Sequence, residues 1–314
     1  MAASGFSGHR LPEMPEEGIY AIEGLPDMGA TGVLETPVFL NSPHSGEFFP
    51  PAFLERAQLP QQTLRKASDL FVDELFMPAV DHGVPLMRAM LPRSFVDLNR
   101  EPFELDPRLI AGPLPVDANT RSLRVAGGLG TVPRVIGDQA EIYAGKISLE
   151  EVLHRIEYFY VPYHLRLHRE LAARHGRHGY VVLLDLHSMP SQASPRATRS
   201  LPDIILGDRF GASCDPALVD LVETLARNLG FRVERNQPYA GGYITEHYGR
   251  PVLGWHALQI EINRALYMDE ARLEPHAGFR HVSEALSSLV VSLSDFQAFE
   301  KRTTALHFTQ KAAE

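Results

Sequence analysis

The feature that most restricts the fold of this chain is a nearly continuous apolar run at residues 180–187, Tyr-Val-Val-Leu-Leu-Asp-Leu-His. A strand with one solvated face alternates apolar and polar residues, so this run indicates a strand covered on both faces. Other short apolar runs, which predict further strands, alternate with segments of helical spacing. The strands are expected at 37–41, 204–208, 231–235 and 256–263, and the helices at about 215–229 and 277–300. This order predicts a three-layer α/β/α fold, with helices on both sides of a largely parallel or mixed central sheet.

The first half of the chain carries weaker patterns. Apolar spacing predicts a helix from about 60 to 82 that stops at Gly83, and then a strand pair, or one interrupted strand, at 84–90 and 94–98. The stretch 101–147 is long and irregular, which is typical of a segment that carries function or covers a site. A helix is expected from Ser148 to about residue 174, with Ser148 and Glu151 as a capping box and a kink at Pro162.

We find no repeat and no linker, so residues 1–314 are expected to form a single domain with an irregular arm at 1–30. The net charge of -9 and the pI near 5.9 provide no basic surface for nucleic acid or an anionic membrane. No signal peptide or apolar run of membrane-spanning length is visible, and Cys214 is the single cysteine. These observations favour a cytoplasmic protein whose partner is neither nucleic acid nor a membrane.

Polar residues that follow the predicted strands are the first candidates for a site, because ligands of α/β sheets bind at the carboxyl ends of strands. Four clusters meet this condition, and they start at His44, Asp97, Asp185 and Glu261.

A His-x-x-Glu pair such as His44 and Glu47 can place an imidazole and a carboxylate on one metal ion, and a distant histidine would complete a zinc site. The spacing alone is weak evidence, because it also occurs at 154/157 and 281/284 inside predicted helices. A capped turn with a surface glutamate is the alternative for the pair at 44 and 47.

His187 ends the apolar strand and shares a face with Asp185 and Leu183; a satisfied core histidine is the alternative. Glu261 lies in a strand where Leu258, Ile260 and Ile262 face the other way. A buried carboxylate needs a partner, so Glu261 is either paired with an arginine or is a general base beside a metal-activated water.

Two arginines flank the predicted strand 94–98. Arg93 and Arg100 would repel each other unless an anion or carboxylates hold them, and guanidinium groups suit bidentate recognition of a carboxylate.

Together these motifs resemble a known family. The segments PHSGE, DLFVDELF, DLNR, DLHSMP, GGYITEHYG and QIEINRALYMDE are similar, in this order and over about residues 37–270, to the N-formylglutamate amidohydrolases. This family is related to the zinc carboxypeptidases and aspartoacylase, and its better-known members act in histidine degradation. The resemblance implies a carboxypeptidase-like α/β/α fold with one Zn²⁺. In this chain, the loop GGLGTVPR that follows DLNR differs from the corresponding loop of those members, and it is expected to form part of the substrate pocket.

The resemblance also implies roles for individual residues. His44, Glu47 and His187 match the metal ligands, and Glu261 matches the carboxylate that activates water. Arg93 matches the group that polarises the scissile carbonyl. Asn99 and Arg100 match the pair that holds the substrate carboxylate.

Further residues are assigned with less specificity. Arg134, Thr245 and Arg264 are possible substrate contacts, with a surface charge, a turn residue and a partner for Glu261 as the respective alternatives. Asp69 and Asp73 are interpreted as helix-capping residues or as partners of a nearby arginine.

The predicted function is therefore zinc-dependent hydrolysis of an N-acyl amino acid, with N-formyl-L-glutamate as the expected substrate. Two alternatives stay open. A related deacylase or carboxypeptidase would keep the metal and cleave another bond, whereas a carboxylate-binding protein would lack catalysis. Glu261 favours an enzyme, since a binding protein has little use for a non-ligand carboxylate in that position.

Overall fold

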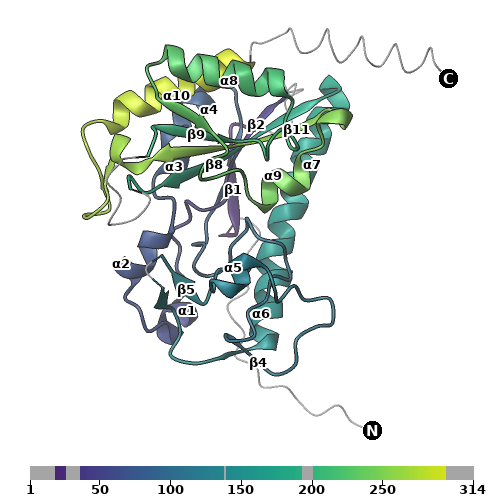
Figure 1. Ribbon diagram of the computed structural model, residues 1–314, viewed down its shortest axis with the longest axis vertical. Helices are drawn as coiled ribbons and strands as arrows, with labels where there is room; N and C mark the ends of the chain where they lie inside the picture. Colours follow the sequence, from purple (N-terminus) through teal and green to yellow (C-terminus); the bar gives the residue numbers. More distant parts are fainter. Residues whose placement is uncertain (1–17, 26–35, 138, 193–200, 295–314) are drawn as a thin grey trace, which may run out of the picture.

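A computed structural model describes residues 18–25, 36–137, 139–192 and 201–294 of the chain. Within these ranges, no helix has both the length and the apolar character needed to cross a membrane. Figure 1 shows a sheet-bearing part above a second part that contains short helices and loops.

A seven-stranded mixed sheet forms the centre of the structure, in the order β1-β3-β2-β8-β11-β9-β10. Strands β3, β2, β8 and β11 are neighbours and run parallel, whereas β1 and β9 are antiparallel to β3 and β11. The seven strands are β1 (Tyr20–Glu23), β2 (Val38–Ser42), β3 (Leu86–Ala89), β8 (Val181–Met189), β9 (Ile204–Gly207), β10 (Val233–Arg235) and β11 (Trp255–Asn263). The carboxyl ends of four adjacent strands therefore meet at one edge of the sheet.

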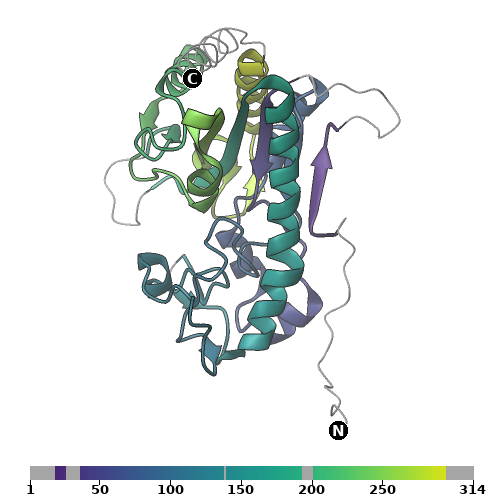
Figure 2. The same cartoon turned by 90° about the vertical axis from the view of Figure 1, so that its right-hand side faces the viewer.

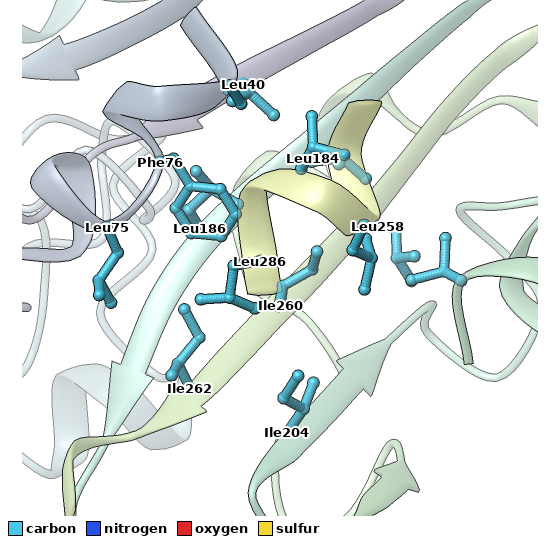
Figure 3. Close-up of a cluster of buried hydrophobic side chains, with 14 of the residues drawn as sticks. Leu40, Leu75, Phe76, Leu184, Leu186, Ile204, Leu258, Ile260, Ile262 and Leu286 are labelled. Atoms are coloured by element: carbon cyan, nitrogen blue, oxygen red, sulfur yellow. The ribbon is translucent and has the colours of Figure 1, made fainter. Parts of the chain in front are cut away.

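Helices cover one face of this sheet and bury an apolar cluster that includes Leu184, Leu186, Leu258 and Ile260 (Figure 3). The helices that contribute to this layer are α3 (Val72–Leu75), α4 (Met77–Asp81), α8 (Pro216–Asn228) and α10 (Phe279–Ser294). Pro216 occupies the first turn of α8, and Asp215 caps the helix by accepting a hydrogen bond from the Ala217 N–H.

The opposite face is covered by α7 (Val161–His178) and α9 (Tyr243–Tyr248), which pack against the other set of strand side chains, including Phe39, Leu183 and Ala257. This alternation along each strand confirms the predicted three-layer α/β/α arrangement with a mixed sheet.

A long helical segment connects the two parts of the molecule (Figure 2). It begins with α6 (Leu149–Arg155), where the Ser148 hydroxyl accepts a hydrogen bond from the Glu151 N–H, which is the serine half of the predicted capping box. The Glu151 carboxylate pairs with Arg56 and Arg155. A π-helical turn, η3 (Ile156–Tyr160), separates α6 from α7, which carries Pro162 in its first turn. Since proline cannot donate a backbone hydrogen bond, the helix changes its bonding pattern just before the position where a kink was expected.

The predicted irregular stretch 101–147 contains only short elements.

The helical elements of the whole chain that have not yet been named are also short. They are α1 (Pro51–Arg56), α2 (Gln61–Leu64), η2 (Arg65–Ala67), α5 (Leu123–Ala126), η4 (Pro251–Leu253) and η5 (Arg264–Leu266). Three two-stranded pairs complete the described elements: β4 (Ile110–Ala111) with β7 (Ile147–Ser148), β5 (Val135–Ile136) with β6 (Ala140–Glu141), and β12 (Met268–Asp269) with β13 (Glu274–Pro275).

Three local predictions differ from the structure. The arm expected to be irregular contributes β1, which pairs with β3. Residues 94–98 contain turns and no strand, and the helix expected over 60–82 is divided into α2, η2, α3 and α4. The break between η2 and α3 includes Phe71, whose φ of 65° lies in the left-handed region that no α-helix continues through.

Candidate metal centre and active site

The parallel strands deliver the candidate residues to one edge of the sheet. His44 follows β2, while His187 and Glu261 lie near the carboxyl ends of β8 and β11. Arg93, Asp97 and Arg100 follow β3, which is the neighbour of β2 on its other side. The four clusters predicted from strand ends therefore lie at the carboxyl ends of four adjacent strands.

Three buried side chains could hold a metal ion: His44, Asp69 and His187. Each offers one ligand atom, and these atoms lie within 4.8 Å of one another. Asp69 Oδ2 is 3.3 Å from His44 Nδ1 and 3.0 Å from His187 Nδ1. Two imidazole nitrogens and a carboxylate oxygen form a donor set that Zn²⁺ uses in catalytic sites.

The outer nitrogens of both histidines are held by carboxylates. His44 Nε2 lies 2.7 Å from Asp97 Oδ1, and His187 Nε2 lies 2.9 Å from Asp185 Oδ2. Both carboxylates are placed to accept a proton from Nε2, and with a divalent cation between the rings each Nδ1 lone pair would face the ion. This arrangement fits a divalent cation between the two rings and Asp69.

The second oxygen of Asp69 is also fixed. Asp69 Oδ1 accepts hydrogen bonds from the Ser188 hydroxyl at 3.1 Å and from Arg264 Nη2 at 3.2 Å. Burial by itself would raise the pKa of Asp69, but hydrogen bonds and charge from His187 and His44 outweigh it and hold the pKa well below the usual value. Asp69 is therefore an anionic group with one oxygen directed at both histidines.

Glu47, predicted as a metal ligand, does not join this cluster. Its side chain is 38% exposed, and its carboxylate pairs with Arg65. The three-residue spacing from His44 brings side chains together on a helix, whereas residues 45–50 contain no helix. Asp69 supplies the carboxylate of the cluster instead.

Sequence reasoning missed Asp69 because the apolar spacing predicted a continuous helix through it. The backbone instead leaves the helical path between η2 and α3, and the Asp69 N–H donates to the His44 carbonyl at 3.0 Å. The repeated aspartates in DLFVDELF were the available signal. Asp73, the second of them, lies 3.4 Å from Arg88, as the alternative of an arginine partner predicted.

Glu261 lies beside the cluster as the direct cross-strand partner of His187. It is buried, and its Oε1 accepts a hydrogen bond from Gln259 Nε2 at 2.7 Å. Burial, assisted by the charge of Asp69, raises the pKa of Glu261 to about 7, against the opposing effect of His187 and Arg93. A carboxylate with such a pKa can both accept and return a proton near neutral pH.

Arg93 and Arg100 are held by the carboxylate of Asp97, which lies between them in the sequence. Arg93 Nη2 donates to Asp97 Oδ2 at 2.7 Å, and Arg100 Nη2 lies 3.5 Å from the same oxygen. Arg100 also donates to the carbonyls of Leu129 and Asn99. Burial lowers the pKa of Arg100 to about 10, with Asp97 opposing the shift, so the guanidinium stays cationic. Of the two arginines, Arg93 is the more exposed, at 24% of its side chain against 11%.

Asn99 contacts the metal cluster through its amide. Asn99 Nδ2 lies 3.1 Å from His187 Nε2, and its Oδ1 accepts a hydrogen bond from the Ile244 N–H at 2.8 Å. Gly242 makes this approach possible, because a Cβ at that position would lie 2.4 Å from the Asn99 amide atoms.

The three less specific candidates have other partners. Arg134 donates to Asp106 at 2.9 Å and to Glu141 at 2.6 Å. The buried Thr245 hydroxyl donates to the Gly242 carbonyl at 2.9 Å. Arg264 contacts Asp69 and Ser188, so its carboxylate partner is Asp69 and not Glu261.

Comparisons with known proteins agree with the motifs. The sequence profile described as N-formylglutamate amidohydrolase matches residues 36–268. An N-formylglutamate deformylase of Pseudomonas aeruginosa is 30% identical over 260 residues, which cover 82% of this chain and 91% of the relative. One from Pseudomonas putida is 31% identical over 237 residues, or 74% of this chain and 82% of the relative.

Solved structures are also similar. The crystal structure of an N-formylglutamate amidohydrolase from Ralstonia eutropha matches with a TM-score of 0.81 and 35% identity, over 89% of this chain and 98% of that one. A gene product of Agrobacterium tumefaciens, 21% identical, shares the fold with a TM-score of 0.58 over 87% of this chain and 96% of that chain.

Proposed function

The chain belongs to the N-formylglutamate amidohydrolase family, and we propose that it hydrolyses N-formyl-L-glutamate to formate and L-glutamate. The observation that carries the proposal is the register of β8 and β11, which places the buried Glu261 beside His187 of the His44-Asp69-His187 cluster. A two-histidine, one-carboxylate centre with an adjacent non-ligand carboxylate supports water-mediated cleavage of an amide.

We propose that His44, Asp69 and His187 hold one Zn²⁺. When bound, the ion would lower the pKa of a water molecule toward about 7 and polarise the acyl carbonyl. With the ion bound, Asp97 and Asp185 would accept the Nε2–H of each ring and so keep Nδ1 available as the ligand atom. Arg264 and Ser188 fix the remaining oxygen of Asp69. In this assignment Arg264 orients a ligand instead of contacting substrate.

Glu261 is the proposed general base. Its carboxylate takes a proton from the attacking water, and the oxygen of that water forms a bond to the formyl carbon. Glu261 then delivers the proton to the amide nitrogen as the carbon–nitrogen bond breaks. The collapse releases formic acid and the amine of glutamate, and transfer of the acid's proton to the amine gives formate and the ammonium form of glutamate, with the carboxylate of Glu261 restored.

The arginines complete the proposed mechanism. Arg93 donates hydrogen bonds to the oxygen that becomes negative in the tetrahedral intermediate, a role worth about 3 kcal/mol per donor. Arg100, with Asn99 beside it, binds a carboxylate of the substrate through Nη2, the edge that donates to neither backbone carbonyl. Arg134 and Thr245 would act only by supporting the surrounding loops, given their internal partners.

Substrate comparison tests the proposal. We expect release of formate from N-formyl-L-glutamate at a kcat/KM well above that for hydrolysis of N-acetyl-L-glutamate or of a dipeptide ending in glutamate. N-formyl-L-leucine is the control for the side-chain carboxylate. Preference for the acetyl compound would indicate a deacylase, and preference for the dipeptide a peptidase.

Metal analysis tests the cofactor separately. We expect about one zinc per chain by elemental analysis, loss of activity after dialysis against a chelator, and recovery on addition of Zn²⁺. Full activity of a chain shown to be free of metal would contradict the proposed centre.

A further inference from the structure

Asp97 contacts two different parts of the proposed machinery. Its Oδ1 lies 2.7 Å from His44 Nε2 and also accepts a hydrogen bond from the Asn99 N–H at 2.9 Å. Its Oδ2 accepts a hydrogen bond from Arg93 Nη2 at 2.7 Å, with Arg100 Nη2 at 3.5 Å. The side chain of Asp97 is only 2% exposed, so water does not compete for these oxygens.

We propose that Asp97 is a positioning residue that couples the metal ligand His44 to the oxyanion group Arg93, so that one carboxylate sets the distance between them. This inference rests on the proposed function. Asp97 itself touches neither substrate nor metal in this assignment. It acts through the two side chains that do.

The chemistry of the contacts explains why a carboxylate is required. His44 Nε2 and Arg93 Nη2 are both donors, and they approach different oxygens of Asp97. An asparagine has one acceptor and one donor group, so it would satisfy either the imidazole or the guanidinium and present an N–H to the other. Position 97 can hold both partners only if both side-chain atoms are acceptors.

Asp185 provides a matched comparison. It holds His187 as Asp97 holds His44, and its other described partners are the side-chain amides of Asn41 and Asn99. Among the described residues, the contacts of Asp185 include no arginine. Asp185 therefore orients a ligand histidine without a direct link to the oxyanion group.

The test is a pair of double-mutant cycles on the full chain. Zinc affinity is measured by competition with a chromophoric chelator, and kcat/KM is measured at saturating zinc for D97N, D185N, R93M, D97N/R93M and D185N/R93M. We expect D97N and D185N each to weaken zinc binding roughly 10- to 100-fold, as loss of a carboxylate behind a ligand histidine does elsewhere. R93M should change zinc affinity by less than about threefold, since it removes no ligand contact.

The activity cycle distinguishes the two carboxylates. We expect R93M and D97N each to reduce kcat/KM about 100-fold or more, the loss typical of an oxyanion donor. The kcat/KM of the D97N/R93M double variant should lie within about threefold of that of the less active single variant, because both changes remove the same function. The losses from D185N and R93M should multiply.

Multiplicative losses for D97N and R93M, or unchanged zinc affinity in D97N, would overturn the inference. If D97N does not give a cooperative thermal transition, D97E replaces it, and the same non-multiplicative result with R93M is required. The wild-type chain separates this inference from the proposed function: without zinc binding and formate release by the wild type, the proposed function itself fails.

Discussion

Glu261 on β11 and His187 on β8 are direct partners in a parallel register, and both side chains leave the sheet on the same face. Their neighbours Ile260 and Leu186 lie on the opposite face, in the apolar cluster under the helices. Two buried strands thus place a proton acceptor beside a candidate metal ligand, and the strand pairing itself determines their separation.

Replacement of Glu261 by glutamine is expected to separate catalysis from metal binding. The E261Q variant should bind zinc like the wild type but lose roughly 100- to 10,000-fold in kcat, since the amide cannot accept the proton. Formate release and elemental analysis measure the two properties. E274Q, at an exposed position in β13, is the control. Wild-type turnover in E261Q would exclude this residue as the base.

Replacement of Asp69 and replacement of Glu47 are expected to have different effects on zinc affinity. Asp69 is buried between the two histidines, whereas Glu47 pairs with Arg65 near the surface. D69N should reduce zinc affinity by at least about 100-fold, while E47Q should stay within a few-fold of the wild type. Competition titration with a chelator measures both. Loss of zinc in E47Q with retention in D69N would restore the assignment expected from the sequence.

Gly242 is expected to be essential for the position of Asn99. A Cβ at position 242 would lie 2.4 Å from the Asn99 amide, so G242A must displace a side chain that contacts His187. We expect about 1 to 3 kcal/mol of destabilisation, as for other overpacked sites, together with reduced activity. Denaturant unfolding and kcat/KM are measured beside G145A, whose added methyl group meets no atom within 4 Å. Equal behaviour of the two variants would argue against the close approach.

His256 is expected to make the fold sensitive to acid. It is buried in β11, and its Nδ1 accepts a hydrogen bond from the Asp215 N–H at 3.3 Å. Burial, with help from His175 and against Asp215, lowers the pKa of His256 to about 4. The unfolded chain therefore binds this proton first as the pH falls.

The contribution of neutral His256 to the free energy of unfolding is fully present above about pH 6.5 and is lost as the pH falls toward 4. The full effect is on the order of 3 kcal/mol, from about 1.4 kcal/mol per pKa unit. Urea unfolding at several pH values measures it, and H256Q, which keeps an acceptor without this titration, should lose less stability over the same range. Identical pH profiles for the two proteins would rule out His256 as the source.

The strands that carry the site were predictable from local sequence. A long apolar run identified β8, and strict alternation identified β11 and placed Glu261 opposite its apolar neighbours. A strand buried on one face alternates apolar and polar residues, and a strand buried on both faces is apolar throughout, because successive side chains point to opposite sides of the sheet. His44, His187 and Glu261 were therefore predicted as candidates from their positions relative to these strands.

The carboxylate of the metal cluster was not predictable in the same way. Apolar spacing around Asp69 indicated a continuous helix, and the left-handed backbone of Phe71 interrupts it. Packing of α3 and α4 against the sheet outweighs local helix propensity there, which is weak evidence by itself. Likewise, the three-residue spacing of His44 and Glu47 could not predict whether their side chains meet, because the backbone between them is not helical.

By itself, the sequence determined the layered α/β fold, the buried strands and the residues at their ends, because these depend on periodic burial along short segments. Only the tertiary structure decided that Asp69 joins His44 and His187, and that Asp97 holds both His44 and Arg93. Such contacts join residues from separate segments, and their geometry depends on strand order and loop path, which no local pattern encodes.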